Sequence, residues 1–255
     1  MPNNHPENNV KLLRLMSRAV NEGLLVADFH PVLHLKHSQS KIYWILCNMT
    51  TDTGQLVPYN KLRTLSKMTE MSVALDRWLM HTALSSLKAL HQDDPDSKVI
   101  VPQSMKSLAN PEYPRWLERQ AEMENVSLRG LIVAFRLPHI VKVLKPAKRC
   151  FSELHKLDAL TMIDAFTDHP GAQKILRVMG TRYAHISSTL LNASDDNVRS
   201  VIKYCKKRRV ALFLSGINKP EEMNLTWSEG ADMLEGSYIH PPTQDLQFRF
   251  SPVIV

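Results

Sequence analysis

The sequence predicts an α/β fold in which roughly eight largely parallel strands alternate with helices and close into a barrel. Apolar, strand-like runs and amphipathic stretches follow one another with short links, an order typical of a sheet whose strands are covered by helices. A length of 255 residues suits one barrel of this kind. The link HLKHSQS at 34–40 is too short for a parallel crossover, so the first two strands are predicted to be antiparallel.

The strands are predicted from short apolar runs with β-branched and aromatic residues, at 24–33, 41–47, 98–103, 130–137, 158–166, 183–187, 210–217 and 232–239. Apolar residues at three-to-four spacing and helix start signals predict helices at 59–68, 73–90, 111–124, 139–154, 171–179, 195–208 and 219–230. Pro146 predicts an interruption within 139–154. The alternation of strand and helix therefore continues to the end of the barrel.

The composition indicates one folded domain. A polar, helical lead-in is expected over 1–20, followed by a single barrel over 21–255 with an extended C-terminal tail. No apolar run approaches the roughly 18 residues of a membrane span, and MPNNHPENNV lacks a signal-peptide core. The cysteines are widely spaced and odd in number, which favours reduced thiols. These features predict a cytoplasmic protein without membrane insertion.

The net charge of +7 is mostly dispersed along the chain. The densest basic stretch, KYCKKRR at 203–209, ends a predicted helix, where the helix dipole favours cations. No zinc-finger, basic-zipper or aromatic RNA-binding signature accompanies it. A solvated helix end is therefore the better interpretation, and no nucleic-acid partner is predicted.

A barrel of this kind carries its site at the C-terminal ends of its strands, which here read WILCN, VPQS, AFRL, MIDAFTD, HISS, LSGIN and LEGSYIHPP. With VPYNKL, LDRW and GADMLEGSYIHPP, they resemble, over about Leu24–Pro242, the EAL family of cyclic di-GMP phosphodiesterases. The resemblance implies an EAL-type modified TIM (β/α)8 barrel. ALDRW, PRWL and GADMLEGSYIHPPTQDLQFRF are most similar to the degenerate FimX-type EAL domains of type IV pilus regulation.

The resemblance assigns altered residues to the family's metal and catalytic positions. In an active member the second strand reads Glu-Ala-Leu and its Glu binds a metal, whereas Trp44 stands there. An indole offers no hard oxygen ligand to Mg²⁺ or Mn²⁺. Among the other vestigial positions, Pro102 replaces a ligand Asn and Ala134 replaces a ligand Glu. Ala165 replaces the second Asp of a pair whose first member is Asp164, and His185 replaces the Lys that positions the hydrolytic water. Ser215 and Asn218 replace two carboxylates, while Glu235 adds one acid nearby.

The family's reaction uses two metals, which several carboxylates must hold. Asp164 alone cannot hold the pair, so the resemblance implies no metal, no cofactor and no phosphodiesterase activity. Asp164, His185 and His240 together are a weak zinc signal, because they come from separate segments without tight spacing. Cys47 is interpreted as a small buried thiol rather than a nucleophile.

The first functional hypothesis is a catalytically inactive regulatory module that binds a protein in a bacterial cyclic di-GMP-type pathway. The resemblance implies a PilZ-type adaptor or a pilus ATPase as partner, in type IV pilus function or motility. It leaves open whether the chain forms a homodimer. A third hypothesis, a newly acquired metal or thiol chemistry, has no motif to support it.

The alternative hypothesis is a receptor that binds cyclic di-GMP without cleaving it. Asn48, at the family's Arg position, lacks a phosphate-binding fork, and Asn218 lacks a carboxylate, so both changes oppose binding. The candidate ligand contacts are His30, Asp76 and Asp164. Each also has a structural interpretation: a hydrogen-bonded barrel-end histidine, a solvated helix pair with Arg77, and the cap of a turn.

Overall fold

The computed structural model of the chain describes residues 6–67, 69–187, 195–223 and 230–251. Its strands are β1 (Leu25–Pro31), β2 (Leu33–His34), β3 (Ile42–Thr50), β4 (Leu56–Pro58), β5 (Lys98–Gln103), β6 (Leu131–Arg136), β7 (Leu160–Asp164), β8 (Tyr183–Ser187), β9 (Ala211–Ser215) and β10 (Met233–Leu234). Its helices are α1 (Pro6–Glu22), α2 (Tyr59–Ser66), α3 (Met71–Asp93), α4 (Met105–Ala109), α5 (Tyr113–Glu124), α6 (Leu137–Lys142), α7 (Leu144–Lys156), α8 (Pro170–Met179) and α10 (Asp195–Arg208).

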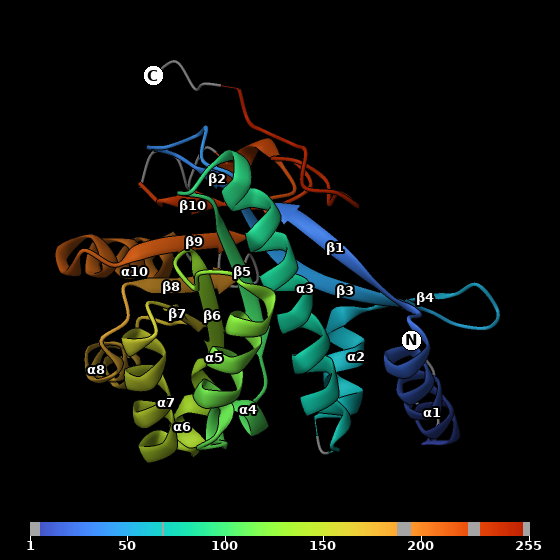
Figure 1. The fold of residues 1–255 in the computed structure, drawn as a ribbon. Coiled ribbons are helices and arrows are strands. Elements are labelled where there is room, and N and C mark those ends of the chain that lie inside the picture. Colours follow the sequence, from blue (N-terminus) through green and yellow to red (C-terminus); the bar gives the residue numbers. More distant parts are fainter. Residues whose placement is uncertain (1–5, 68, 188–194, 224–229, 252–255) are drawn as a thin grey trace.

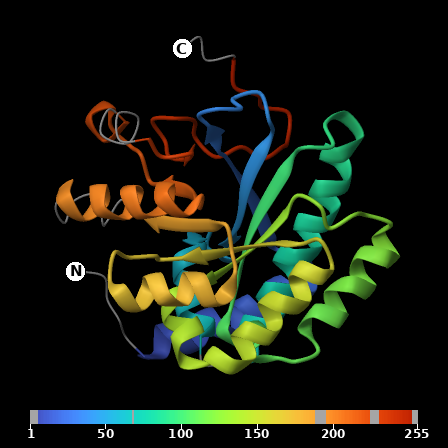
Figure 2. The ribbon, with the colours of Figure 1, turned by 90° about the vertical axis from the view of Figure 1, so that its left-hand side faces the viewer.

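The strands form one sheet that curls into a nearly closed barrel, in the order β1-β3-β5-β6-β7-β8-β9-β10-β2. The run from β3 to β10 is parallel. β1 pairs with β3 antiparallel, with His30 opposite Trp44, which confirms the prediction drawn from the short link. Figures 1 and 2 show the helices around the outside of the strands and the red C-terminal segment beside the blue segment of β1 and β2.

Two apolar layers hold the barrel together. The outer layer lies between the strands and the helices and includes Leu79, Leu84 and Phe151, all fully buried. The inner layer fills the barrel and consists of Val32, Ile42, Ile100, Ile132, Ala134, Met162, Phe213 and Met233. Alternate residues of a strand face the inside, so the residues two positions beyond the inner layer stand at the end where the strands finish. That alternation places Trp44, Arg136, Asp164 and Ser215 at the mouth.

Helix α1 covers the end of the polar lead-in expected over 1–20 and runs on to Glu22. Three of its apolar side chains, Leu12, Met16 and Ala19, are buried in the outer layer. This segment therefore contributes to the same core as the barrel. Among the described helices, none is long and apolar enough to cross a membrane.

Several element boundaries differ from the predictions. The run at 24–33 is split into β1 and β2, and α4 and β4 were not predicted. The break in 139–154 falls at Val143 rather than at Pro146. Pro146 lies in the first turn of α7, where its missing N–H has no intrahelical partner to lose. The helix predicted over 219–230 begins at 220, and its part over 224–229 lies outside the described residues.

The strand predicted over 232–239 was wrong beyond Leu234, because the chain turns at Gly236. Gly236 has φ 151°, and a Cβ there would lie 2.2 Å from the carbonyl oxygen of Ile217. The close approach is fixed by backbone hydrogen bonds from Ile217 N to Glu235 O at 2.9 Å and from Tyr238 N to Ile217 O at 3.0 Å. The turn therefore holds Glu235 at the mouth.

Substituting this glycine tests the close approach. Gly236→Ala is expected to lower the free energy of unfolding by roughly 2–4 kcal/mol, since it adds steric overlap to an unfavourable φ. Gly180→Ala is the matched control, because Gly180 also has positive φ (66°) but has nothing within 4 Å of the added Cβ. Urea unfolding followed by circular dichroism measures both. Equal losses in the two variants would show that the contact with Ile217 contributes nothing.

Candidate functional site

A cavity of about 490 Å³ opens at the C-terminal ends of the barrel strands. Strand β4, helix α2 and the residue after β7, Ala165, contribute to its lining beside the strand ends. Its lining includes the predicted site residues His30, Trp44, Asn48, Asp164, Ala165, His185 and Ser215. Pro102, Ala134, Asn218, Glu235 and Asp76 are absent from the lining. The structure thus brings most of the vestigial positions together in the lining of this cavity. The other predicted residues lie outside it.

A hydrogen-bonded relay joins three neighbouring strands at the floor of this cavity. His185 Nδ1 lies 2.7 Å from Asp164 Oδ1, and His185 Nε2 lies 2.7 Å from Ser215 Oγ. A carboxylate can only accept, so Nδ1 carries the proton and, in the neutral ring, Nε2 accepts from the Ser215 hydroxyl. His185 is 2% exposed. A histidine buried to this extent requires partners at both nitrogens, and the relay supplies them.

Arg136 completes the surroundings of Asp164. Its Nε lies 3.6 Å from Asp164 Oδ2. Burial by itself raises the pKa of Asp164, but the hydrogen bond from His185 and the charges of His185, Arg136 and Arg63 outweigh burial and hold this pKa below its ordinary value. Asp164 is therefore a carboxylate at neutral pH, with its charge balanced inside the protein. It does not cap the following turn with this side chain.

Trp44 closes the top of the inner layer. Its ring packs edge-on against His185, with ring centres 4.9 Å apart, and against Phe213 at 5.4 Å. Its Nε1 is buried and has no hydrogen-bond partner among the described residues. The indole therefore occupies the space beside Asp164 with apolar surface where the family resemblance expects a metal-binding carboxylate.

This donor set does not fit a pair of divalent metals. Asp164 is already engaged by His185 and Arg136, and a guanidinium beside the carboxylate repels a cation. Within the described residues, no group of at least three His, Cys, Asp or Glu side chains is placed to hold a metal ion. His240, considered with Asp164 and His185 for zinc, packs on Phe248 with ring centres 3.6 Å apart and hydrogen-bonds Pro241 O.

The order Asp164–His185–Ser215 is that of a carboxylate, a base and a hydroxyl nucleophile. An acyl-transfer site also needs donors for the developing oxyanion, commonly backbone N–H groups next to the nucleophile. Here the N–H of Gly216, which follows Ser215, donates to Glu235 Oε2 at 3.2 Å. Its engagement favours a structural role for the relay.

The remaining predicted positions have structural partners within the barrel. His30 Nδ1 lies 2.8 Å from Glu235 Oε1, so His30 has a bonded partner at the barrel end. Asn48 donates from Nδ2 to Asp28 Oδ2. Asn218 Oδ1 accepts from Ser237 Oγ at 2.7 Å and so fastens the loop after β10. Pro102 and Ala134 are adjacent residues of paired strands within the barrel wall.

Asp76 is neither a solvated surface residue nor part of the mouth. It is 3% exposed on α3, and its Oδ2 accepts from Ser104 N at 2.9 Å and from the Ser107 hydroxyl. These bonds fix the loop between β5 and α4. Burial raises the pKa of Asp76 to about 6, although the serine hydrogen bonds lower it. Its helix neighbour Arg77 lies over the Trp116 ring, 5.6 Å from its centre.

Both cationic residues of the cavity lining were missed from the sequence: Arg63 on α2 and Arg136 at the end of β6. The signal for Arg136 was present, since it lies two positions after Ala134, on the same side of the strand. Arg63 had no comparable signal, because a helical arginine is usually solvated. Together they bring positive charge to the mouth, which Asn48 does not supply.

Comparison with known proteins gives a consistent result. A family model described as the EAL domain matches residues 14–242. The chain is 23% identical over 249 residues to an uncharacterised 76.5 kDa protein of Thiocystis violacea, covering 97% of the chain and 36% of that protein. It thus spans about a third of that relative's length.

Two solved structures show the same fold. The Pseudomonas aeruginosa FimX EAL domain bound to c-di-GMP has a TM-score of 0.83 and 20% identity, covering 94% of this chain and 99% of that one. The Xanthomonas citri FimX EAL domain in complex with c-diGMP has a TM-score of 0.84 and 14% identity, covering 96% and 98%. The expected barrel with an antiparallel first pair is confirmed.

The raised pKa of Asp76 gives a pH-dependent prediction. Because the folded pKa of about 6 exceeds the ordinary aspartate value of 3.8, the folded state binds this proton more tightly. The contribution of Asp76 to stability therefore falls as pH rises from about 4 to 6. Asp76→Asn keeps an acceptor for both serines and cannot ionise. We expect this variant to match the wild type near pH 4 and to exceed it at pH 7 by up to about 3 kcal/mol.

Urea unfolding from pH 4 to 7.5 measures this difference. The exposed Asp158→Asn is the control and should follow the wild type at every pH. The comparison is made between variants because His34 and His139, whose pKa values burial lowers to about 4, titrate in the same window with the opposite sign. A constant gap between Asp76→Asn and the wild type across this range would refute the assignment.

Proposed function

The chain belongs to the EAL domain family, and from that premise we propose that it is a catalytically inactive EAL domain, a regulatory module of a bacterial cyclic di-GMP pathway that acts by binding a protein partner. The observation that supports this most is the engagement of Asp164, the one acid retained at the vestigial metal positions, by His185 and Arg136. Activation of water by two metals needs several free hard ligands. The mouth offers two histidines, a serine, two arginines and an indole instead. Its other carboxylate, Asp28, accepts hydrogen bonds from Asn48 and Gln244.

The partner hypothesis has a surface to support it. In the ribbon β1–β3–β4, Val26 is paired with Asn48, Asn48 with Pro58, and Thr50 with Leu56. Paired residues share a face of a sheet, so Val26 and Leu56 lie on the face that carries Asn48 at the mouth. They are 43% and 58% exposed. An apolar rim beside a ligand-sized cavity is typical of a protein contact.

The FimX resemblance points to a cytoplasmic setting in type IV pilus function or motility, with a PilZ-type adaptor or a pilus ATPase as the class of partner. Asp52, in the turn between β3 and β4, pairs with Arg18 of α1 at 3.6 Å. The rim contact is therefore expected to depend on apolar burial more than on salt.

The second candidate is a receptor that binds cyclic di-GMP without cleaving it. A specific observation favours it: Arg63 and Arg136 line the mouth cavity and could hold phosphate in place of the arginine missing at Asn48. The solved FimX EAL domains of the same fold were crystallised with this nucleotide. The two candidates are compatible, since a bound nucleotide can alter a rim contact.

The rim is tested by affinity capture with the immobilised full chain. Val26→Glu/Leu56→Glu places two charges on the apolar rim and should abolish retention of a specific partner. Met123→Glu/Val178→Glu, which changes exposed apolar residues on α5 and α8, should retain it. A set of retained proteins that is the same for all three baits would contradict the rim assignment.

Nucleotide binding and cleavage are tested in one experiment. Cyclic di-GMP is titrated calorimetrically in Mg²⁺ or in chelator, and the mixture is then chromatographed. We expect no linear product, and binding in both buffers that weakens by about ten-fold or more in Arg63→Gln but not in the exposed control Lys148→Gln. A linear product would overturn the proposed inactivity. Absence of heat would remove the receptor candidate alone.

A further inference from the structure

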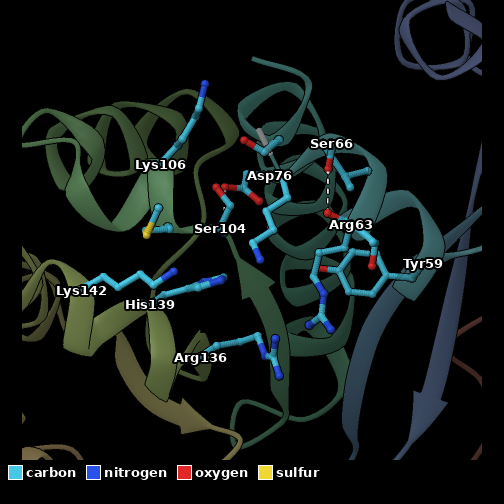
Figure 3. Close-up of a pocket in the computed structure, with 14 residues that line it drawn as sticks. Tyr59, Arg63, Ser66, Asp76, Ser104, Lys106, Arg136, His139 and Lys142 are labelled. Atoms are coloured by element: carbon cyan, nitrogen blue, oxygen red, sulfur yellow. Dashed lines mark hydrogen bonds between the residues drawn. The ribbon is translucent and has the colours of Figure 1, made fainter. Parts of the chain in front are cut away.

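A second cavity, of about 300 Å³, lies beside the mouth between α2, α3, α4 and α6. Figure 3 shows its two walls, with His139 and Lys142 extending from α6 toward the side where Arg63 and Tyr59 of α2 lie. It shares Tyr59, Arg63 and Arg136 with the mouth. Its volume is at the lower end of the range for small-molecule sites.

The lining of this second cavity is strongly basic. It contains Arg63, Lys67, Lys106, Arg136 and Lys142, against a single acid, Asp76. Asp76 is committed to Ser104 and Ser107 and is nearly fully buried. The charge of the cavity is therefore set by its cations.

Some of these cations have partners and others do not. Lys106 pairs with Glu70, and Arg136 pairs with Asp164. Figure 3 also shows Lys106 pointing away from the cavity. Among the described residues, Arg63, Lys67 and Lys142 have no carboxylate within 4.0 Å. Like charges held together in this way repel one another unless an anion offsets them.

The surroundings of His139 indicate that the positive charges of this cavity lie close together. Its Nδ1 is buried and has no hydrogen-bond partner among the described residues. Burial, and then the positive charges of Arg136, Arg63 and Lys67, lower the pKa of His139 to about 4. Two cations from α2 and its C-terminal end and one from the end of β6 therefore act on one ring that keeps an unused polar atom. Such an atom is usually satisfied by water or a ligand.

We propose that this second cavity binds a compact phosphate-type oxyanion carrying at least two negative charges, such as the di- or triphosphate group of a small metabolite. Arg63 supplies a planar fork suited to phosphate oxygens, and Lys67 and Lys142 supply point charges from opposite walls. The occupant differs from a cyclic dinucleotide in the mouth, because it needs neither the barrel-end strands nor Asn48.

The residues shared by the two cavities allow an anion in the second cavity to influence binding at the mouth. Arg63 and Arg136 face both cavities, so an anion in the second cavity changes the charge available at the mouth. Coupling of this kind requires that the anion bind differently in the two states of the mouth. The chain would then sense a phosphorylated metabolite as well as its main partner.

The test uses inorganic pyrophosphate as the probe, titrated calorimetrically into the full chain at constant ionic strength with chloride as the balancing anion. We expect one site per chain. Lys67→Gln/Lys142→Gln should weaken binding by about ten-fold for each lysine, the effect of losing one charge-assisted hydrogen bond. Lys148→Gln/Lys207→Gln removes the same charge from exposed positions on α7 and α10 and should bind as the wild type does.

Two results would overturn the proposal: no binding of pyrophosphate to the wild type, or the same weakening in both double variants, which would indicate general screening. Lys67 and Lys142 do not line the mouth. Cyclic di-GMP titration of the same variants therefore reports on the mouth separately, so failure of this site and failure of the proposed function remain distinguishable.

Discussion

The charge balance around Asp164 is the constraint on which the mouth of this barrel depends. A carboxylate buried at the ends of packed strands must be neutralised, or folding carries an uncompensated ion. His185 and Arg136 do this through one hydrogen bond and one ion pair. Ser215 then satisfies the other imidazole nitrogen, and Trp44 covers the ring. The substitutions that give Trp44, His185 and Ser215 are thus part of one closed arrangement around Asp164.

That arrangement explains why a barrel can lose its chemistry and keep its fold. The inner apolar layer ends at Phe213 and Met162, and Trp44 and His185 pack on Phe213 from the mouth, so the substituted site residues extend the packing that stabilises the barrel. The relay engages the carboxylate that could otherwise bind a metal ion. It leaves a cavity lined by Arg63 and Arg136 and by Asp28, whose carboxylate accepts from Asn48 and Gln244. A site with two arginines can bind anions without activating water.

Much of the architecture could be predicted because it follows from local signals. Apolar runs and helical periodicity located the strands and most of the helices, and one short link fixed the antiparallel pair. The turn at Gly236 could not be predicted, since it depends on the approach of Ile217 from another strand. The role of Asp76 could not be predicted for the same reason. The sequence indicated a solvated residue beside Arg77, whereas Asp76 accepts a hydrogen bond from Ser104 N, which lies in a distant part of the chain. Arg63 and Lys142 line one cavity only because tertiary packing places α2 opposite α6.

The C-terminal segment has a consequence for how the chain acquires its structure. Phe29 exchanges backbone hydrogen bonds with Thr243, Asp28 accepts from Gln244 at 2.9 Å, and Tyr43 Oη donates to Phe248 O at 2.8 Å. The last of these joins residues 205 positions apart. Contacts between residues so far apart in the sequence form late in folding, because closing the long loop between them costs conformational entropy. On a ribosome, β1 therefore emerges long before the segment that fastens it, and its outer edge awaits a partner that is synthesised almost at the end of this barrel.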